Sequence, residues 1–199
     1  MMGGLIFRSL WRSYLRRERE LREKFDRSLS FQDAMFDRWE RARRLGFGEG
    51  ASIYNSALVY GEVEVGANSW IGPYTLLDGG AGIKIGAWCA ISAGTQIYTH
   101  HNVKRMLSGG RHAPYLGPIS IGDCCFIGSQ TVIDPNVMIG DHCLVAANSF
   151  VNTSHPSFTI IAGTPATAIG RVELAGDEVI LHYDRHASPE GQNAVPEAR

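Results

Sequence analysis

Two adjacent histidines, His100 and His101, stand where a regular six-residue pattern of aliphatic residues stops. The pattern reaches Ile97 and resumes at Ile121, and the segment between them is rich in glycine. A histidine anchored by a regular element at the mouth of a loop is placed to accept and release a proton near neutral pH, as a general base must. A pair of surface histidines with no chemical role explains the spacing equally well.

The interruption of the pattern predicts a loop over residues 101–118. The interval from Ile97 to Ile121 is a whole multiple of six, so the chain leaves the pattern near Thr99 and rejoins it in phase near Pro118. The glycines and prolines of this stretch are typical of an exposed excursion from a regular element.

The six-residue pattern itself predicts the fold. A period of two indicates a strand and a period of 3.6 a helix, whereas six indicates one short strand plus one turn. Three such units make one triangular coil with the aliphatic side chains stacked inside. We therefore expect a mainly β protein, with a parallel β-helix over residues 49–171. The positions are Ile53, Val59, Val65, Ile71, Leu77 and Ile83, then, after a shift of phase, Ile85, Ile91 and Ile97, and beyond the loop Ile121, Ile127, Ile133, Ile139, Val145 and Val151.

Small side chains recur four residues after the aliphatic ones, where the corners of a triangular coil leave little room. Cys89, Cys125 and Cys143 fall at these positions, and a thiol there behaves as a compact apolar group. Because disulfide frameworks are typical of small secreted chains, we expect reduced thiols and a cytoplasmic protein. The absence of a Cys-x-x-Cys pair makes a zinc ribbon unexpected.

Helices are expected over residues 1–48. Apolar residues recur there at helical spacing, and a second helix is expected within "SFQDAMFDRWERARRLGFG", with Ser30 and Asp33 as capping candidates. We interpret this segment as a cap that closes the first coil or packs on a neighbouring subunit. The alternative is an interfacial helix that contacts an anionic membrane, and the mixed charges of "RRERELREKFDR" argue against it.

The remaining features are the C-terminal segment and the overall charge and hydropathy, which argue against several classes of protein. Residues 172–199 are expected to supply one closing strand, from "VELAGDEVILHYD", and a disordered tail. The net charge is −1, which gives no indication of a nucleic-acid partner. No apolar run is long enough to span a membrane, and the first residues lack the cleavage site of a signal peptide.

Three stretches resemble a known family. "ISAGTQIYTHHNVKRMLSGG", "PISIGDCCFIGSQTVIDPNVMIGDHCLVAANSFVN" and "IIAGTPATAIG" are similar to the hexapeptide acyltransferases of the galactoside and maltose acetyltransferase type. They are especially similar to bacterial enzymes that acetylate sugars of surface polysaccharides. The resemblance covers about Ile53 to Arg171, including the loop. It implies a left-handed β-helix, a homotrimer, acetyl-CoA as the acyl donor, and a sugar or sugar nucleotide as the acceptor.

By this resemblance His100 is the catalytic base, and His101 is a rival displaced by one residue. The base would take a proton from an acceptor hydroxyl or amine, which would then attack the thioester directly, without an acyl-enzyme. A backbone N–H would stabilise the oxyanion. Neither a serine nor a cysteine stands in a recognisable nucleophile motif.

The resemblance also implies where the acyl donor lies, in a groove shared with the next subunit. Arginine or lysine usually holds the nucleotide phosphates in this family, but the matching positions here are Thr153 and Thr167, so Arg171 is the substitute. Small residues would suit close approach of the pantetheine arm, although β-helix corners require them in any case. The expected donor-binding residues are Phe126, Gly128, Ser129, Ala146, Ala147, Thr164 and Arg171.

For the acceptor, the candidate residues are Tyr74, Asp78 and His101. Tyr74 stands near the place of an asparagine that galactoside-type enzymes use. Asp78 could bind a sugar hydroxyl or orient His100, or it could be a solvated turn residue.

Two other classes share the fold. A metal-dependent hydrase of the γ-carbonic anhydrase type would need three converging histidines, and the five-residue histidine spacing of that class is not found. A non-catalytic scaffold would not need a loop that follows a histidine. We therefore expect an enzyme without a metal.

Overall fold

The computed structural model describes residues 2–184. The helices are α1 (Met2–Phe25), α2 (Phe31–Met35), α3 (Arg38–Arg44) and α4 (Val103–Leu107). The strands are β1 (Ser52–Ile53), β2 (Leu58–Val65), β3 (Trp70–Ile71), β4 (Leu76–Ile85), β5 (Ala90–Ile91), β6 (Gln96–Tyr98), β7 (His100–His101), β8 (Tyr115–Leu116), β9 (Ile119–Ile121), β10 (Phe126–Ile127), β11 (Val132–Ile133), β12 (Met138–Ile139), β13 (Leu144–Val145), β14 (Phe150–Val151), β15 (Thr159–Gly163), β16 (Ala166–Ala175) and β17 (Glu178–Tyr183).

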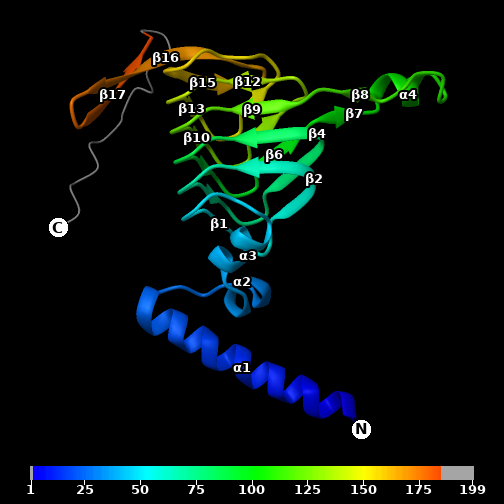
Figure 1. The fold of residues 1–199 in the computed structure, drawn as a ribbon, viewed down its shortest axis with the longest axis vertical. Coiled ribbons are helices and arrows are strands. Elements are labelled where there is room, and N and C mark those ends of the chain that lie inside the picture. The colour runs from blue at the N-terminus through cyan, green and yellow to red at the C-terminus, as the bar shows by residue number, and fades with distance from the viewer. Residues whose placement is uncertain (1, 185–199) are drawn as a thin grey trace.

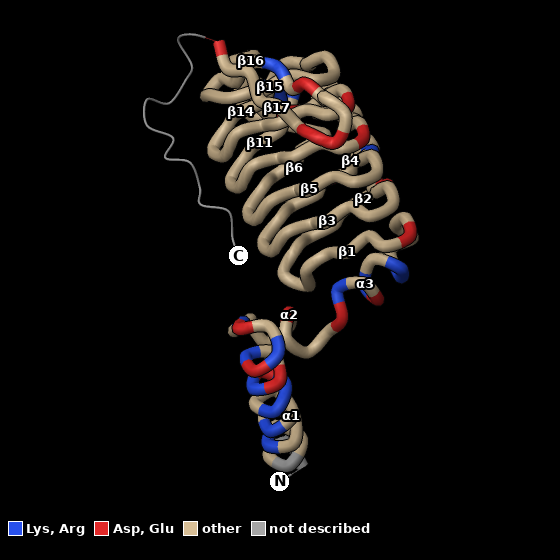
Figure 2. The backbone as a smooth tube through the Cα atoms, turned by 90° about the vertical axis from the view of Figure 1, so that its left-hand side faces the viewer, with Lys and Arg blue, Asp and Glu red and all other residues tan. Residues whose placement is uncertain are grey.

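The strands stack into a parallel solenoid with three faces (Figures 1 and 2). Face A contains β1, β3, β5, β10, β13 and β15. Face B contains the first parts of β2 and β4 with β6, β11 and β14, and face C contains the second parts of β2 and β4 with β9 and β12. The expected β-helix is therefore confirmed, and its hexapeptide period fits a left-handed coil.

The aliphatic positions of the repeat form the core. Ile71 lies in register with Ile91, and Ile91 with Ile127, so each side chain sits on its equivalent in the next coil. All three are fully buried. Burying such a side chain contributes about 1.5–3 kcal/mol, and the ladder repeats this contribution in every coil.

The shift of phase between Ile83 and Ile85 has a structural cause in the corner that follows Leu77. Gly61 pairs with Gly79, but Val63 then pairs with Ile83, so β4 holds two more residues than β2 at the corner between faces B and C. A Cβ atom at Gly79 would collide with the carbonyl group of Glu62. Glycine is therefore required for the chain to turn this corner tightly.

The first coil is closed by α3 and the chain that follows it. Ala42 and Phe47 are buried in the solenoid core. The expected second helix is in fact two helices, because Phe36 and Asp37 are extended. Asp37 caps α3 by accepting a hydrogen bond from the Glu40 amide at 2.8 Å, whereas Ser30 makes no capping bond through its side chain. Ser30 thus occupies the expected N-cap position of α2, but its hydroxyl donates to Asp33 at 3.0 Å instead of accepting from a backbone amide, and Asp37 is a second cap that the sequence did not predict.

Helix α1 does not cover the coil, but projects from it beyond α2 (Figures 1 and 2). It packs on α2 from Tyr14 onward, where the rings of Tyr14 and Phe31 lie 5.5 Å apart and Arg17 Nε donates to the carbonyl oxygen of Ala34 at 3.3 Å. No helix within residues 2–184 has the length and apolar character needed to cross a membrane.

The other end of the solenoid is closed by a hairpin rather than by one strand. Strand β16 pairs antiparallel with β15 and with β17. The turn between β16 and β17 contains Gly176 at a φ of 63°, which glycine adopts at little cost. The expected tail lies outside the described residues.

Candidate active site

The candidate base lies where the chain leaves the solenoid. Strand β6 ends at Tyr98, and His100 and His101 then pair antiparallel with Leu116 and Tyr115, which carry the chain back. The amide of Gly117 donates to the carbonyl oxygen of Thr99 at 2.9 Å and closes the base of this excursion. Helix α4 forms the outer end of the loop (Figure 1). His100 is thus the first residue beyond the coil.

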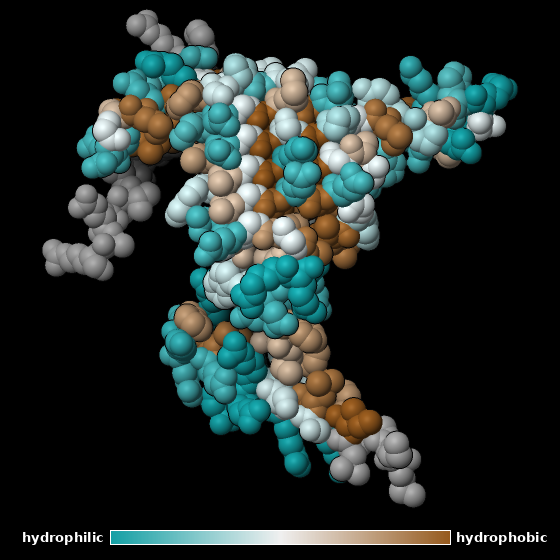
Figure 3. All heavy atoms as spheres, viewed as in Figure 1, coloured by the Kyte–Doolittle hydropathy of each residue, from teal (hydrophilic) through white to brown (hydrophobic). Residues whose placement is uncertain are grey.

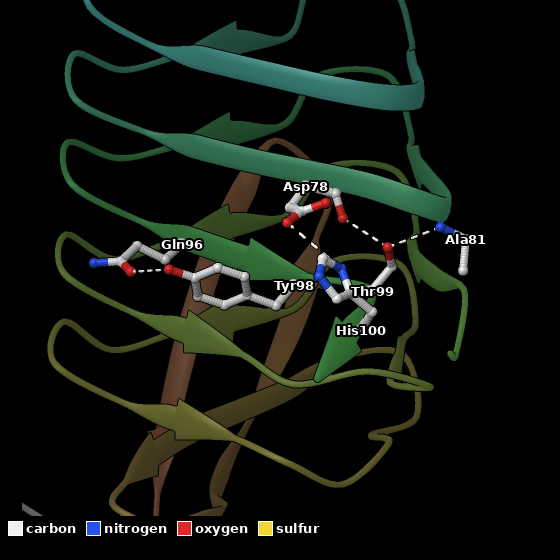
Figure 4. A network of polar contacts seen from close by, with 6 residues as sticks. All are labelled: Asp78, Ala81, Gln96, Tyr98, Thr99 and His100. Carbon is white, nitrogen blue, oxygen red and sulfur yellow. Dashed lines mark hydrogen bonds and ion pairs between the residues drawn. The ribbon is translucent and has the colours of Figure 1, made fainter. Parts of the chain in front are cut away.

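His100 faces a carboxylate of the preceding coil (Figure 4). Its Nδ1 lies 3.5 Å from Oδ2 of Asp78. The His100 side chain is 35% exposed and that of Asp78 is 17% exposed. A carboxylate at this position favours the tautomer with hydrogen on Nδ1, which leaves the lone pair of Nε2 available for a proton.

Thr99 fixes the point of departure, and the sequence analysis did not single it out as a site residue. Its side chain is fully buried. Oγ1 donates to the carbonyl oxygen of Asp78 at 2.6 Å and accepts from the amide of Ala81 at 2.9 Å. The hydroxyl therefore ties the His100 strand to the neighbouring coil at both Asp78 and Ala81 (Figure 4). The only signal in the sequence was a small polar residue directly before the histidine pair.

His101 has different surroundings. Its ring stacks on Tyr115 with a centroid separation of 4.9 Å and an angle of 17°. Its Nδ1 is buried and has no hydrogen-bond partner among the described residues. Asp78 is paired with His100 and not with His101, so the structure distinguishes the two histidines by their partners.

A second polar pair lies beside His100. Tyr98, in register with Asp78 on face B, donates its hydroxyl to Oε1 of Gln96 at 2.6 Å (Figure 4). Both side chains point outward from β6. They add hydrogen-bonding groups to the surface next to the candidate base.

Tyr74 does not join this group. It occupies the corner between faces A and B, at a φ of 58°, with an exposed side chain. Asp78 lies four residues later, at the far end of the face B segment of β4, and four extended residues span about 13 Å. Of the expected acceptor residues, only Asp78 lies against His100 within one chain.

The expected donor-binding residues gather on another part of the solenoid. Phe126 is exposed on face A, and the others except Arg171 lie at or near the corner between faces A and B. A Cβ atom at Gly128 would collide with the amide of Ala147, so glycine is needed there for stacking. Thr164 Oγ1 donates to the carbonyl oxygen of Asn148 at 3.1 Å. Four of the expected donor-binding residues lie at the same corner of two successive coils: Gly128 and Ser129 follow β10, and Ala146 and Ala147 follow β13.

Arg171, the expected phosphate ligand, is on β16 and is already paired. Its Nη1 lies 3.3 Å from Oε2 of Glu173, and the same oxygen lies 2.7 Å from Nε2 of His182. The Arg171 side chain is largely exposed, so the guanidinium keeps donors free for another anion.

The cysteines are poorly placed to act as nucleophiles. The hydrogen bond with Cys125 lowers the pKa of the Cys143 thiol to about 7, but Cys143 is buried. Cys89, Cys125 and Cys143 are buried, and each thiol donates to a carbonyl oxygen of the following coil at 3.0–3.2 Å. Cys124 is exposed, but desolvation and the charge of Asp123 raise the pKa of its thiol. A raised pKa lowers the thiolate fraction, which is the reactive form. Within residues 2–184 no three His, Cys, Asp or Glu side chains are grouped as metal ligands would be.

Comparison with known proteins gives a consistent result. Residues 118–153 match the family model described as bacterial transferase hexapeptide (six repeats). The carnitine operon protein CaiE of Escherichia coli is 30% identical over 151 residues, which cover 73% of this chain and 75% of CaiE. The galactoside O-acetyltransferase of Escherichia coli is 28% identical over 128 residues, which cover 54% of this chain and 63% of the relative.

Other relatives share less of their length or only the fold. Serine acetyltransferase 4 of Arabidopsis thaliana is 33% identical over 118 residues, and the match covers 57% of this chain and 31% of that relative. The crystal structure of AntD, an N-acyltransferase from Bacillus cereus in complex with dTDP and 3-hydroxybutyryl-CoA, superposes with a TM-score of 0.56 at 24% identity. That match covers 68% of this chain and 90% of AntD, and it shows that the fold is shared.

Proposed function

Because the chain belongs to the hexapeptide-repeat transferases, we propose that it is an acetyltransferase that uses acetyl-CoA and acetylates a sugar or sugar nucleotide. The observation that carries this proposal is the placement of His100. It is held by Asp78 at the one corner where the chain leaves the solenoid between Ile53 and Val151. A filled solenoid has no internal pocket, so a site must be built where a loop departs.

The chemistry supported by this geometry is direct transfer. With hydrogen on Nδ1, facing Asp78, the His100 Nε2 accepts the proton of an acceptor hydroxyl or amine. The freed oxygen or nitrogen attacks the thioester carbonyl, and a backbone N–H stabilises the tetrahedral oxyanion. The carbon–sulfur bond then breaks, the thiolate takes the proton from His100, and the products are the acetylated acceptor and free CoA.

The relatives support both substrates. AntD is described as a complex with dTDP and an acyl-CoA, and a related structure of it contains dTDP-4-amino-4,6-dideoxyglucose and Coenzyme A. The galactoside enzyme is named for O-acetylation. A sugar-linked acceptor and a CoA thioester donor are therefore the substrates that we propose here, with bacterial surface polysaccharide as their destination and the cytoplasm, where four free thiols persist, as the place of reaction.

The active assembly that we propose is a homotrimer. His100 lies beyond the B–C corner, whereas Ala146, Ala147 and their neighbours lie at the A–B corner. One face of the solenoid separates these two groups within a chain. A neighbouring subunit that brings its A–B corner to the B–C corner of the first would complete the site, with His101, Tyr74 and Asp78 available to the acceptor.

The decisive experiment measures free thiol released from acetyl-CoA in the presence of a panel of amino-sugar and hydroxy-sugar nucleotides. At least one member should give release above the rate of spontaneous hydrolysis, and the product should be heavier by one acetyl group. Failure of every acceptor, together with failure to bind CoA in a calorimetric titration, would exclude the proposed activity.

A further inference from the structure

We propose that the first half of α1 is a docking helix for an anionic membrane surface. This inference is independent of the proposed reaction, because it concerns the end of the molecule that carries no candidate site residue. The sequence predicted the helices of residues 1–48 as one capping segment, but in the structure the cap and the projecting helix belong to different segments. The first coil is closed by α3, with Ala42 and Phe47 in the core, so α1 is not needed as a cap.

The outer half of α1, residues 6–15, has an exposed apolar stripe. In Figure 3 hydrophobic residues gather along this projecting part of the molecule. Ile6 and Phe7 are 66% and 65% exposed, and the apolar side chains that follow them at helical spacing are exposed as well. Within α1 the remaining members of the stripe are Leu10, Trp11 and Leu15.

The opposite side of the same half is basic. Arg8 and Arg12 lie four residues apart, and Arg16, just beyond residues 6–15, continues the same row along the helix. Residues 6–15 contain no acidic residue. A helix with aromatic and aliphatic residues on one side and arginines on the other is the kind that lies in the interface of an anionic bilayer. The aromatic Trp11 suits the headgroup level, because its ring has an apolar body and a polar edge.

The mixed charges that argued against a membrane belong to a different part of the helix. Glu18, Glu20 and Glu23 are all in the second half, which packs on α2. There Arg17 is paired with Glu20 at 3.1 Å. The solvated, charge-paired half and the unpaired basic half thus have separate functions, and the projecting one carries positive charge that complements anionic headgroups (Figure 2).

The test is co-sedimentation of the full chain with vesicles of phosphatidylcholine, with and without phosphatidylglycerol. We expect binding only to the vesicles with phosphatidylglycerol, weaker as salt is added. Phe7→Glu should lower the partition coefficient at least about tenfold, and Arg12→Glu should lower it by a similar factor. The matched controls are Val179→Glu, at an exposed apolar site on β17, and Arg43→Glu, on α3. Both should bind as the unaltered chain does.

Two readouts separate membrane docking from self-association. The fluorescence of the protein should shift to shorter wavelength on binding vesicles, and Trp11→Phe should remove that shift while binding remains. The mass in solution, measured by light scattering, should be the same for Phe7→Glu and for the unaltered chain. Equal binding to neutral and anionic vesicles would overturn the proposal. So would a Phe7→Glu variant that dissociates into smaller assemblies but still binds vesicles normally, because a second copy would then cover the stripe.

Discussion

His100 Nδ1 and Asp78 Oδ2 lie 3.5 Å apart although they belong to different coils of the solenoid. They meet because Asp78 is in register with Tyr98, and the chain turns outward two residues later. The imidazole is therefore oriented by a rigid parallel ladder, while the loop on its other side is free to shape an acceptor site. This arrangement distinguishes His100 from every other histidine that the structure describes, because no other histidine is paired with an aspartate.

Replacing His100 by alanine should lower kcat by about 10²–10⁴-fold, the usual contribution of a general base. The KM for acetyl-CoA should change little, because the expected donor residues lie at another corner. The comparison is His101→Phe, which keeps an aromatic ring against Tyr115 and should raise the KM for the acceptor but lower kcat far less than His100→Ala does. Steady-state kinetics of both variants decide between the histidines, and the reverse order of losses would make His101 the base.

Asp78 should act through His100 and not independently of it. Asp78→Asn keeps the shape of the side chain but replaces the carboxylate that faces Nδ1 by an amide, which no longer fixes the tautomer and orientation of the ring, so kcat should fall by about tenfold or more. In a His100→Ala background the same substitution should have almost no further effect. The two single variants and the double variant form the cycle to measure. Additive losses would show that Asp78 binds substrate or supports the fold by itself.

The Thr99 hydroxyl should matter for stability as well as for activity. Thr99→Val conserves the shape but leaves the Ala81 amide without its hydroxyl partner, while the Asp78 carbonyl keeps only the Thr99 amide at 3.1 Å, which should cost about 1–3 kcal/mol of unfolding free energy. Thr99→Ser keeps the hydroxyl and should cost less. Urea unfolding monitored by circular dichroism measures both values. A Thr99→Val variant as stable as the unaltered chain would show that these bonds do not hold the corner.

The fold could be predicted because each hexapeptide carries its own strand and turn, so the signal is local and repeated. Ile71, Ile91 and Ile127 are fully buried at the positions that the count by six selects. The arrangement of the N-terminal helices could not be predicted, because it depends on contacts between segments that are distant in the sequence. Asp33 accepts from the amide of Ser56 at 2.9 Å, and this contact ties α2 to the first coil while Asp37 begins a new helix.

The candidate site was predicted in part for the same reason. His100 was singled out by the break in the pattern together with the family resemblance, and Tyr74 and Asp78 were named because they stand near the place of an asparagine that galactoside-type enzymes use one coil before the histidine. Only the register of β4 with β6 shows that Asp78 lies at the His100 end of face B and Tyr74 at the other end. Thr99 was not predicted as a site residue, because a threonine is common at a corner of the coil. Its two side-chain hydrogen bonds depend on the positions of Asp78 and Ala81, which only the folded structure shows.

Arg171 should bind the nucleotide part of the donor. Arg171→Gln should raise the KM for acetyl-CoA about tenfold or more, the usual effect of losing a hydrogen bond to a charged group. The KM for acetyl-pantetheine, which lacks the nucleotide, should not change. Glu173→Gln removes the carboxylate that pairs with Arg171 at 3.3 Å and should lower the KM for acetyl-CoA. Equal effects of Arg171→Gln on the two donors would place the phosphate contact elsewhere.

The separation of the two residue groups within one chain predicts complementation between inactive variants. His100→Ala should lack the base, and Ala147→Trp should block the donor groove with an exposed bulky ring at the A–B corner. If each site takes its base from one subunit and its groove from the next, trimers assembled from equal amounts of the two variants contain intact sites. Every trimer that contains both variants has one intact site out of three, so a preparation freed of the homotrimers should have about a third of the activity of the unaltered chain.

The experiment is co-expression of the two variants with different affinity tags, purification through both tags in turn, and measurement of thiol release. Each variant expressed alone is the control and should be inactive. A site contained in one chain would give no activity in the mixture, because every subunit would then carry one defect. Activity only after co-expression, and not after mixing of the purified variants on ice, would further show that subunits do not exchange on that timescale and that the restored sites were formed during assembly.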